Sequence, residues 1–195
     1  MVGNTTNYTE EDILRCFFVL PKNQARQKIA KMLGLGEGSV KAILEILKDK
    51  NIISSTRKGH FLTSEGLKIL DRALSIVSLP VRLKLGKKLP GEVQVASVLK
   101  RPAGKLNVLL LRDEAVRRGA EGAIILTFRK GSLELGFKAK QQFNFLIPYF
   151  ELEDGNLLLL SFGRSYAECE RALISMLIMA SPTFRRIASE IVSKE

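Results

Sequence analysis

The sequence predicts an α+β protein in which helices come first and a mostly antiparallel sheet follows. Apolar residues recur at spacings of three and four up to about residue 77, which indicates amphipathic helices. From residue 93 onward, short apolar runs separated by turn residues indicate strands, and helical patterns return near the end of the chain. Strands grouped apart from helices are typical of α+β folds.

Two domains are expected, at 1–80 and 93–195, with a linker at 81–92. The chain has 195 residues, 46% of them hydrophobic, which is enough for two small cores. Residues 78–92 carry two prolines, two glycines and four basic residues. This composition is typical of a domain boundary, and its alternating apolar and basic residues leave room for one short strand.

Three short helices are predicted before residue 51. The first covers 10–19, with Thr9 as its N-cap and Asp12 completing a capping box. The second covers about 24–33, and the third covers about 40–50 with Ser39 as its N-cap. The segment GLGEG between them offers the positive φ angles that a sharp corner needs, at Gly34, Gly36 and Gly38.

A basic hairpin is predicted after the third helix. Its strands are expected at 52–56 and 61–63, joined by a turn of Arg57, Lys58, Gly59 and His60. A fourth helix then starts at about residue 64 and runs to about residue 77. Its apolar face is expected to consist of Leu67, Leu70, Leu74 and Val77.

This order of elements resembles the winged-helix family of transcription regulators over about 10–77. The most specific part runs from GLGEG through the third helix to RKGHFLTSEG, where a basic hairpin is closed by the Leu-Thr-x-x-Gly that often starts the next helix in such regulators. The resemblance implies a winged helix-turn-helix, in which the hairpin is the wing. The family also contains modules that bind proteins or serve structure alone.

A helix-turn-helix binds double-stranded DNA by placing its recognition helix in the major groove. The residues expected on the groove side are Ser39, Lys41, Ala42 and Glu45. Phosphate contacts are expected from the second helix, through Arg26, Lys28 and Lys31. The wing would reach a flanking phosphate or the minor groove with Arg57 and Lys58, with His60 beside them. RNA is a weaker hypothesis, because no exposed aromatic platform for stacking bases is evident.

The positive charge is concentrated in the same half of the chain. The net charge is +11. Residues 1–90 hold 16 Lys and Arg against 8 Asp and Glu, which leaves +8, whereas residues 91–195 hold 15 against 12, which leaves +3. A phosphate-binding face requires such an excess, although a generally basic protein would also have one.

The second half is predicted to form strands followed by two helices. The strands are expected at 93–100, 123–129, 133–138, 143–152 and 157–162, and the helices at 165–180 and 183–193. The run 107–122 reads as either a strand or a helix. The apolar stretch 172–180 is expected in the domain core, with a subunit interface as the alternative.

A weak candidate ligand site lies in the run LRDEAVRRGAEG. Its charged residues could line a site for a small charged effector, with one further arginine at a strand–helix junction: Arg112, Asp113, Arg117, Arg118 and Arg164. The favoured interpretation is a solvated helix with ion pairs from Asp113 to Arg117 and from Glu114 to Arg118.

The sequence offers no familiar catalytic or metal-binding arrangement. Cys16 and Cys169 each lie among apolar residues without a second ligand at metal spacing, and His60 is the one histidine. No glycine-rich phosphate loop is present. We therefore expect no cofactor, no metal and no catalytic residue, and a protein that is not an enzyme.

The chain is expected to be cytoplasmic. The start, MVGNTTNYTEED, has no basic region or apolar run, so no signal peptide is expected. The most apolar run is too short to span a bilayer, so no membrane is expected as a partner.

The order of the two parts, together with the run RDEAVRRGAEGA, is similar to an archaeal family in which a winged helix precedes a domain of unknown function. The leading hypothesis is a DNA-binding transcription regulator, active as a homodimer, whose second domain binds an effector or dimerises. The alternatives are a protein-interaction module and a small enzyme with a nucleic-acid-binding appendage.

Overall fold

The computed structural model describes residues 7–193 except 101, 103, 105, 137 and 140. The chain forms two compact units. The first comprises residues 1–72 together with 186–195, and the second comprises residues 73–185. The final stretch of the chain therefore packs with the N-terminal unit, which the sequence pattern did not indicate.

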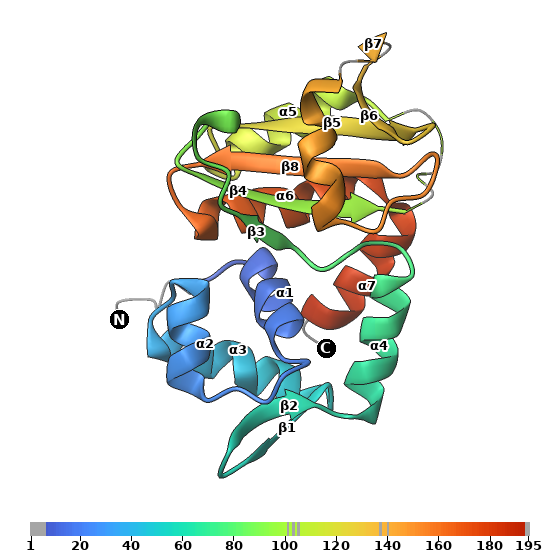
Figure 1. The fold of residues 1–195 in the computed structure, drawn as a ribbon. Helices are drawn as coiled ribbons and strands as arrows, with labels where there is room; N and C mark the ends of the chain where they lie inside the picture. The colour runs from blue at the N-terminus through green and yellow to red at the C-terminus, as the bar shows by residue number, and fades with distance from the viewer. Residues whose placement is uncertain are drawn as a thin grey trace. The chain divides into compact units, whose positions relative to one another are not determined.

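The first unit contains helices and one hairpin, in the order predicted. Figure 1 shows the hairpin extending away from the helices. The elements are α1 (Glu10–Val19), α2 (Arg26–Leu33), α3 (Glu37–Asp49), β1 (Ile53–Thr56), β2 (Gly59–Leu62) and α4 (Ser64–Leu74). Buried apolar residues recur at helical spacing along α3, at Val40, Ile43, Leu44 and Leu47, as predicted.

The start of α1 is held by a buried ionic cluster. The capping box of Thr9 and Asp12 is confirmed, since each side chain bonds the other's backbone amide. The carboxylate of Asp12 also lies 2.6 Å from Nη1 of Arg15, and both side chains are buried. Arg15 donates a second hydrogen bond, of 2.7 Å, to the carbonyl oxygen of Leu33 at the end of α2. The cluster thus joins the beginning of α1 to the end of α2.

The turn between α2 and α3 is shorter than predicted. Gly34 adopts a left-handed φ of 66° and ends α2, as a glycine at this position usually does. Gly36 is the N-cap of α3, however, so the predicted cap Ser39 and the predicted turn residue Gly38 both lie inside the helix. A single left-handed residue is sufficient for the corner, which leaves the other two glycines free to adopt ordinary φ angles.

The hairpin is also tighter than predicted. Ser55 pairs with His60 and Thr56 pairs with Gly59, so only two residues remain in the turn. Gly59 has φ +134°, and a Cβ there would lie 2.6 Å from the backbone of Gln24. His60 exchanges two backbone hydrogen bonds with Gln24, of 2.9 and 3.0 Å. The segment before α2 therefore pairs with β2.

The buried face of α4 agrees with the prediction only in part. Leu70 and Val77 are buried as predicted, but the helix ends at Leu74, before Val77. Leu67 is 47% exposed, whereas Ile69, Leu70 and Ala73 are buried. The physical reason is a close approach at Gly66, where a Cβ would lie 2.1 Å from the carbonyl oxygen of Ile52. Because Gly66 has no side chain, its face of α4 packs directly on the chain at Ile52, and Leu67 is turned outward.

The second unit is built on a six-stranded sheet in which every pairing is antiparallel, as predicted. The strand order is β3-β4-β8-β5-β6-β7. The strands are β3 (Val81–Leu83), β4 (Val93–Leu99), β5 (Gly122–Arg129), β6 (Ser132–Leu135), β7 (Lys138–Ala139) and β8 (Leu157–Gly163). Residues 81–92, expected as a linker, contribute β3 and a short 3-10 turn, η1 (Gly86–Lys88).

Both faces of the sheet are covered (Figure 1). One face packs against α6 (Tyr166–Ala180), and α5 (Val108–Arg117) contacts both α6 and β5. The other face carries an apolar cluster that includes Ala96, Val98, Leu126 and Leu158, together with Phe143 and Leu146 from the 3-10 helix η2 (Gln141–Tyr149). Burial on both faces explains why β4 and β8 are almost continuously apolar.

Two sequence interpretations of this unit are settled by the structure. The run 107–122 is a helix, α5, capped by Asn107 and followed by β5. The strand predicted at 143–152 is wrong, because this segment contains η2. Phe143, Phe145 and Ile147 alternate like a strand, but Phe143 and Leu146 are three residues apart and buried, which matches a 3-10 turn.

The hairpin predicted around Lys130 and Gly131 is confirmed. Both residues have positive φ angles, of 48° and 78°, as a two-residue hairpin turn of this kind requires. The run 172–177 and Ala180 are buried within α6. The chain ends with α7 (Pro182–Val192). Across the described residues, no helix is long and apolar enough to traverse a lipid bilayer.

Candidate nucleic-acid interface

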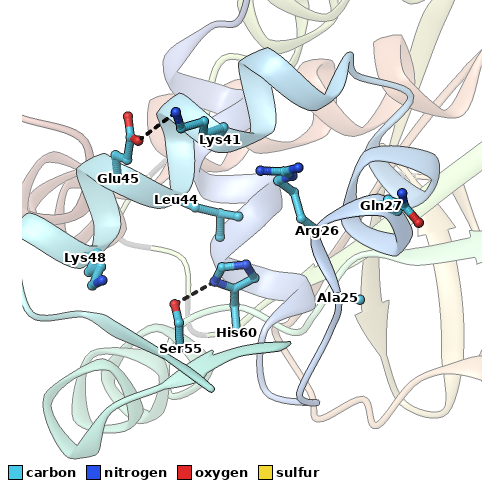
Figure 2. A pocket seen from close by; sticks show the side chains of 9 residues that line it. All are labelled: Ala25, Arg26, Gln27, Lys41, Leu44, Glu45, Lys48, Ser55 and His60. Carbon is cyan, nitrogen blue, oxygen red and sulfur yellow. Dashed lines mark hydrogen bonds and ion pairs between the residues drawn. The ribbon is translucent and has the colours of Figure 1, made fainter. Parts of the chain in front are cut away.

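The first unit has a surface hollow of about 410 Å³ between α2, α3 and the hairpin (Figure 2). It brings together residues that lie far apart in the sequence. The lining residues are Ala25, Arg26, Gln27, Lys41, Leu44, Glu45, Lys48, Ser55 and His60. Three of them are Lys or Arg and one is Glu, so the hollow carries a net positive charge.

Four of the predicted DNA-contacting residues line this hollow, namely Arg26, Lys41, Glu45 and His60. Lys48 also lines the hollow but was not among the predicted contacts, although its position could have been inferred from the sequence. Lys48 lies three residues after Glu45 and seven after Lys41, so it lies on the same side of α3. Ser55 and Gln27 could not have been found in this way, because only the tertiary structure brings them to the hollow.

Two of the three cations of the hollow form ion pairs with carboxylates, and both pairs are exposed to solvent. Arg26 lies 3.2 Å from Glu37, and Lys41 lies 3.7 Å from Glu45, with all four side chains substantially exposed. Exposed pairs of this kind contribute at most about 1 kcal/mol, so an incoming phosphate can compete with them. Lys48 has no ionic partner among the residues that the structure describes.

His60 lines the hollow, and one of its ring nitrogens has a hydrogen-bond partner. Its Nδ1 is 2.8 Å from the hydroxyl oxygen of Ser55. Partial burial lowers the pKa of His60 below its usual value, and the positive charges of Arg26 and Lys48 lower it further. Both effects favour the neutral form of the imidazole, in an environment that favours negative charge.

The remaining predicted contacts lie outside the hollow. Arg57 and Lys58 occupy the exposed turn of the hairpin, and Lys28 and Lys31 are exposed on α2. All four are free of ionic partners within the described part of the chain. Ser39 and Ala42 are only half-exposed on α3. The hydroxyl of Ser39 donates a hydrogen bond of 3.4 Å to the carbonyl oxygen of Asn7.

None of the weak ligand-site residues of the second unit lines either of the two cavities described for the residues that the structure covers. Arg117 and Arg118 each lie 2.8 Å from the carboxylate of Glu114, so the predicted Glu114–Arg118 pair is present, whereas Arg117 pairs with Glu114 and not with Asp113. Arg164 lies 3.2 Å from Glu121. A cavity of about 400 Å³ in this unit is lined by other residues, namely Ser75, Lys100, Glu151, Leu152, Glu153 and Asn156.

Both cysteines are free thiols and are buried. Burial raises the pKa of Cys16 to about 12, against a smaller opposing effect of Arg15. Burial also raises the pKa of Cys169 to about 12, with the charges of Glu168, Glu170 and Glu121 acting in the same direction. No group of three or more His, Cys, Asp and Glu side chains that could hold a metal was found within the part of the chain that the structure covers.

Comparison with known proteins matches both parts of the chain. Residues 9–68 match the family described as "PH0730-like, N-terminal domain", and residues 90–180 match "Domain of unknown function (DUF4443)". The structure titled "Hypothetical protein PH0730 from Pyrococcus horikoshii OT3" is similar with a TM-score of 0.78 and 29% sequence identity, over 93% of this chain and 100% of that chain.

The chain is similar to an archaeal two-domain protein. The two matches are consistent with the resemblance to an archaeal family in which an N-terminal domain precedes a domain of unknown function. None of these descriptions names a function. No protein with a curated description matches the chain.

Proposed function

We propose that the chain is a DNA-binding transcription regulator of the winged-helix type, acting in the cytoplasm. The observation that carries this proposal is the cationic hollow bounded by α2, α3 and the hairpin. Phosphate contacts supply most of the affinity of nonspecific DNA binding, and helix–hairpin surfaces of this form position such contacts around the groove. The partner would be double-stranded DNA, with α3 as the recognition helix and the hairpin as the wing.

The unpaired cations at the tip of the hairpin extend the same surface. Arg57 and Lys58 are exposed, and no carboxylate competes for them within the described residues. Cations without partners can neutralise phosphates without first breaking an ion pair. The acidic residue on α3, Glu45, lies 3.7 Å from Lys41. It is suited to accept a hydrogen bond from a cytosine amino group, which would contribute to sequence preference.

The decisive experiment measures the affinity for genomic DNA fragments at about 50 mM and about 200 mM salt. Each phosphate contact contributes about 0.9 to the slope of log affinity against log salt. The double variant Arg57→Ala, Lys58→Ala should therefore weaken binding and reduce the slope by about 2. Failure of the protein to bind DNA at low salt would overturn the proposal and favour the protein-interaction role.

A matched control comes from the second unit. Lys84 and Arg129 are also exposed, and neither has an ionic partner within the structure as described. The double variant Lys84→Ala, Arg129→Ala removes the same amount of positive charge from the second unit. It should leave the salt slope unchanged, which separates local contacts from the effect of net charge.

We further propose that residues 73–185 either sense a small-molecule effector or hold two copies together as a homodimer. A two-fold dimer would place two winged helices on two half-sites of one operator. Native mass spectrometry of the protein as purified tests both roles, because it reports the number of chains and any retained small molecule. A strictly monomeric chain that carries nothing would contradict both.

A further inference from the structure

We propose that the hollow between α2, α3 and the hairpin seats one phosphate of bound duplex DNA, and that His60 takes up a proton when the phosphate enters. This inference rests on the proposed DNA-binding function and deepens it. It assigns a ligand to the hollow and makes DNA binding dependent on pH. It is carried by the placement of His60 beside Arg26, Lys41 and Lys48 in the lining of a concave surface.

The charge that surrounds the hollow favours an anion. Lys41 and Lys48 face it from α3, and Arg26 faces it from α2. The carboxylates nearby are Glu45, which also lines the hollow, and Glu37, which pairs with Arg26. The local balance is therefore positive. The first turn of α2 contains no acidic residue and no capping side chain, so its backbone amides add to the positive potential.

The orientation of the His60 ring leaves one nitrogen available to a ligand. Figure 2 shows the ring of His60 within the group of lining side chains, with Ser55 beside its Nδ1. The opposite ring nitrogen, Nε2, has no partner among the residues described. A phosphate oxygen in the hollow can accept a hydrogen bond from a protonated Nε2.

Protonation of the ring takes one proton from solvent. In the tautomer of the neutral ring that carries its proton on Nε2, Nδ1 accepts a hydrogen bond from the hydroxyl of Ser55, whose oxygen lies 2.8 Å away. When a phosphate enters, a proton from solvent is added to the ring, so that both ring nitrogens carry a proton. A rotation of the Ser55 hydroxyl then makes that oxygen the acceptor for Nδ1–H, while Nε2–H donates to the phosphate. The phosphate charge opposes the effects that lower the pKa of His60 without DNA, which are partial burial first and then repulsion by Arg26 and Lys48.

Linkage between proton and DNA binding follows from this step. If DNA binding raises the proton affinity of His60, then protons raise the DNA affinity by the same factor. In the pH window between the free and bound pKa values of His60, affinity should increase about tenfold for each unit by which the pH falls. Above that window, the ring is neutral in both states and the dependence disappears.

The direct test is an NMR titration of the imidazole in the full-length, tag-free chain. His60 is the single histidine in the sequence, so its signal needs no assignment by mutation. The titration is carried out on the free protein, with a saturating short duplex, and with inorganic phosphate. The expected result is a pKa that rises when the duplex is bound. An unchanged pKa with duplex bound would overturn the inference while leaving the proposed DNA-binding function intact.

Other results of the titration distinguish a failure of this inference from a failure of the proposed DNA-binding function. A pKa that rises with inorganic phosphate but not with the duplex would overturn the assignment to DNA and identify a small phosphate-bearing ligand instead. A chain that does not bind the duplex at low salt would overturn the proposed function itself, and with it this inference. The duplex affinity measured from about pH 8 to about pH 6 should rise for the natural chain and stay level for His60→Gln.

A matched pair of lysine variants tests the electrostatic origin of the low pKa of His60. Lys48→Met removes a charge that lines the hollow, so the pKa of His60 in the free protein should rise toward its usual value. Lys28→Met removes an exposed charge that does not line the hollow, and the pKa of His60 should stay where it is. Equal effects of the two variants would contradict the local origin of the effect.

Discussion

At the scale of single residues, Glu114 was predicted to lie on a solvated helix, but its side chain is buried and contributes to the packing of the second unit. Its carboxylate is buried on α5 and accepts a hydrogen bond of 2.6 Å from the hydroxyl of Ser175 on α6. Arg117 and Arg118 each donate to it at 2.8 Å. Charge-assisted bonds of this length are among the stronger ones in proteins, and the bond from Ser175 joins α6 to α5.

Replacement of Glu114 by Ala should therefore destabilise the second unit. The change leaves the buried hydroxyl of Ser175 without its acceptor, at a cost of about 1–3 kcal/mol in the free energy of unfolding. Urea unfolding at pH 7 measures this cost. Asp113→Ala is the control, because Asp113 is exposed and has no partner within the described structure. Equal losses in the two variants would refute the assignment.

The same carboxylate predicts a dependence on pH. Burial alone would raise the pKa of Glu114, but hydrogen bonds from Ser175 and Arg118 and the charges of both arginines outweigh it, so the pKa is lowered. Below the usual value of 4.5, the unfolded chain binds this proton before the folded chain does. The stability contributed by Glu114 is thus complete above that value and is lost as the pH falls through the folded pKa. Measured by urea unfolding at a series of pH values, Glu114→Gln should flatten this decline.

The two thiols should be inert in the folded protein. Both are buried, and a pKa of about 12 leaves almost no thiolate at pH 8. We expect no labelling of Cys16 or Cys169 by a thiol reagent under native conditions, and labelling of both after unfolding in guanidinium. Mass spectrometry of the labelled chain counts the modified residues. Rapid native labelling of either cysteine would contradict its burial.

At the scale of elements, two glycines explain where the sequence interpretation failed. The sequence pattern places Gly38 in the turn before α3 and gives Gly66 no influence on the face of α4. In the structure, Gly38 lies inside α3 with open space around it, whereas a Cβ at Gly66 would collide with the carbonyl of Ile52. Helical periodicity reports that a helix exists. It does not report how closely another backbone approaches.

Because a Cβ has space at Gly38 but not at Gly66, replacement by alanine should have opposite effects on stability at the two positions. Gly38→Ala should stabilise the first unit by about 0.4–1 kcal/mol, because alanine restricts the unfolded chain and meets nothing in the helix. Gly66→Ala should destabilise it, because the methyl group would force α4 away from Ile52. Thermal unfolding followed by circular dichroism ranks the two variants against the natural chain. A stabilising Gly66→Ala would show that the contact is not tight.

At the scale of the whole molecule, the end of the chain belongs with its beginning. Residues 186–195 group with residues 1–72. Within this unit, Lys50 donates a hydrogen bond of 3.0 Å to the carbonyl oxygen of Glu190, and the carboxylate of Glu190 pairs with Arg72 at 2.9 Å. The Arg72 pair is exposed and contributes little by itself, so burial of the apolar side of α7 contributes more to stability.

Ile191→Ala should therefore weaken the N-terminal unit from a distant position in the sequence. Ile191 is only 1% exposed, and truncation of a buried isoleucine costs about 2–5 kcal/mol. The NMR signal of His60 reports directly on the first unit. In the Ile191→Ala variant, the urea concentration at which this unit is half unfolded should fall. Ser189→Ala, at an exposed position on the same helix, should change it by less than about 0.5 kcal/mol. An unchanged midpoint for Ile191→Ala would contradict the grouping.

The sequence by itself determined the order of elements in the first unit, the antiparallel character of the sheet and four residues of the hollow, because these depend on local periodicity, turn residues and the position of charges along the chain. Tertiary structure decided that Lys48, Ser55 and Gln27 join them and that 143–152 contains a 3-10 helix. It also decided that Glu114 is buried. These features depend on contacts between residues far apart in the sequence. A periodic pattern carries no information about which distant backbone or side chain will occupy the space beside it.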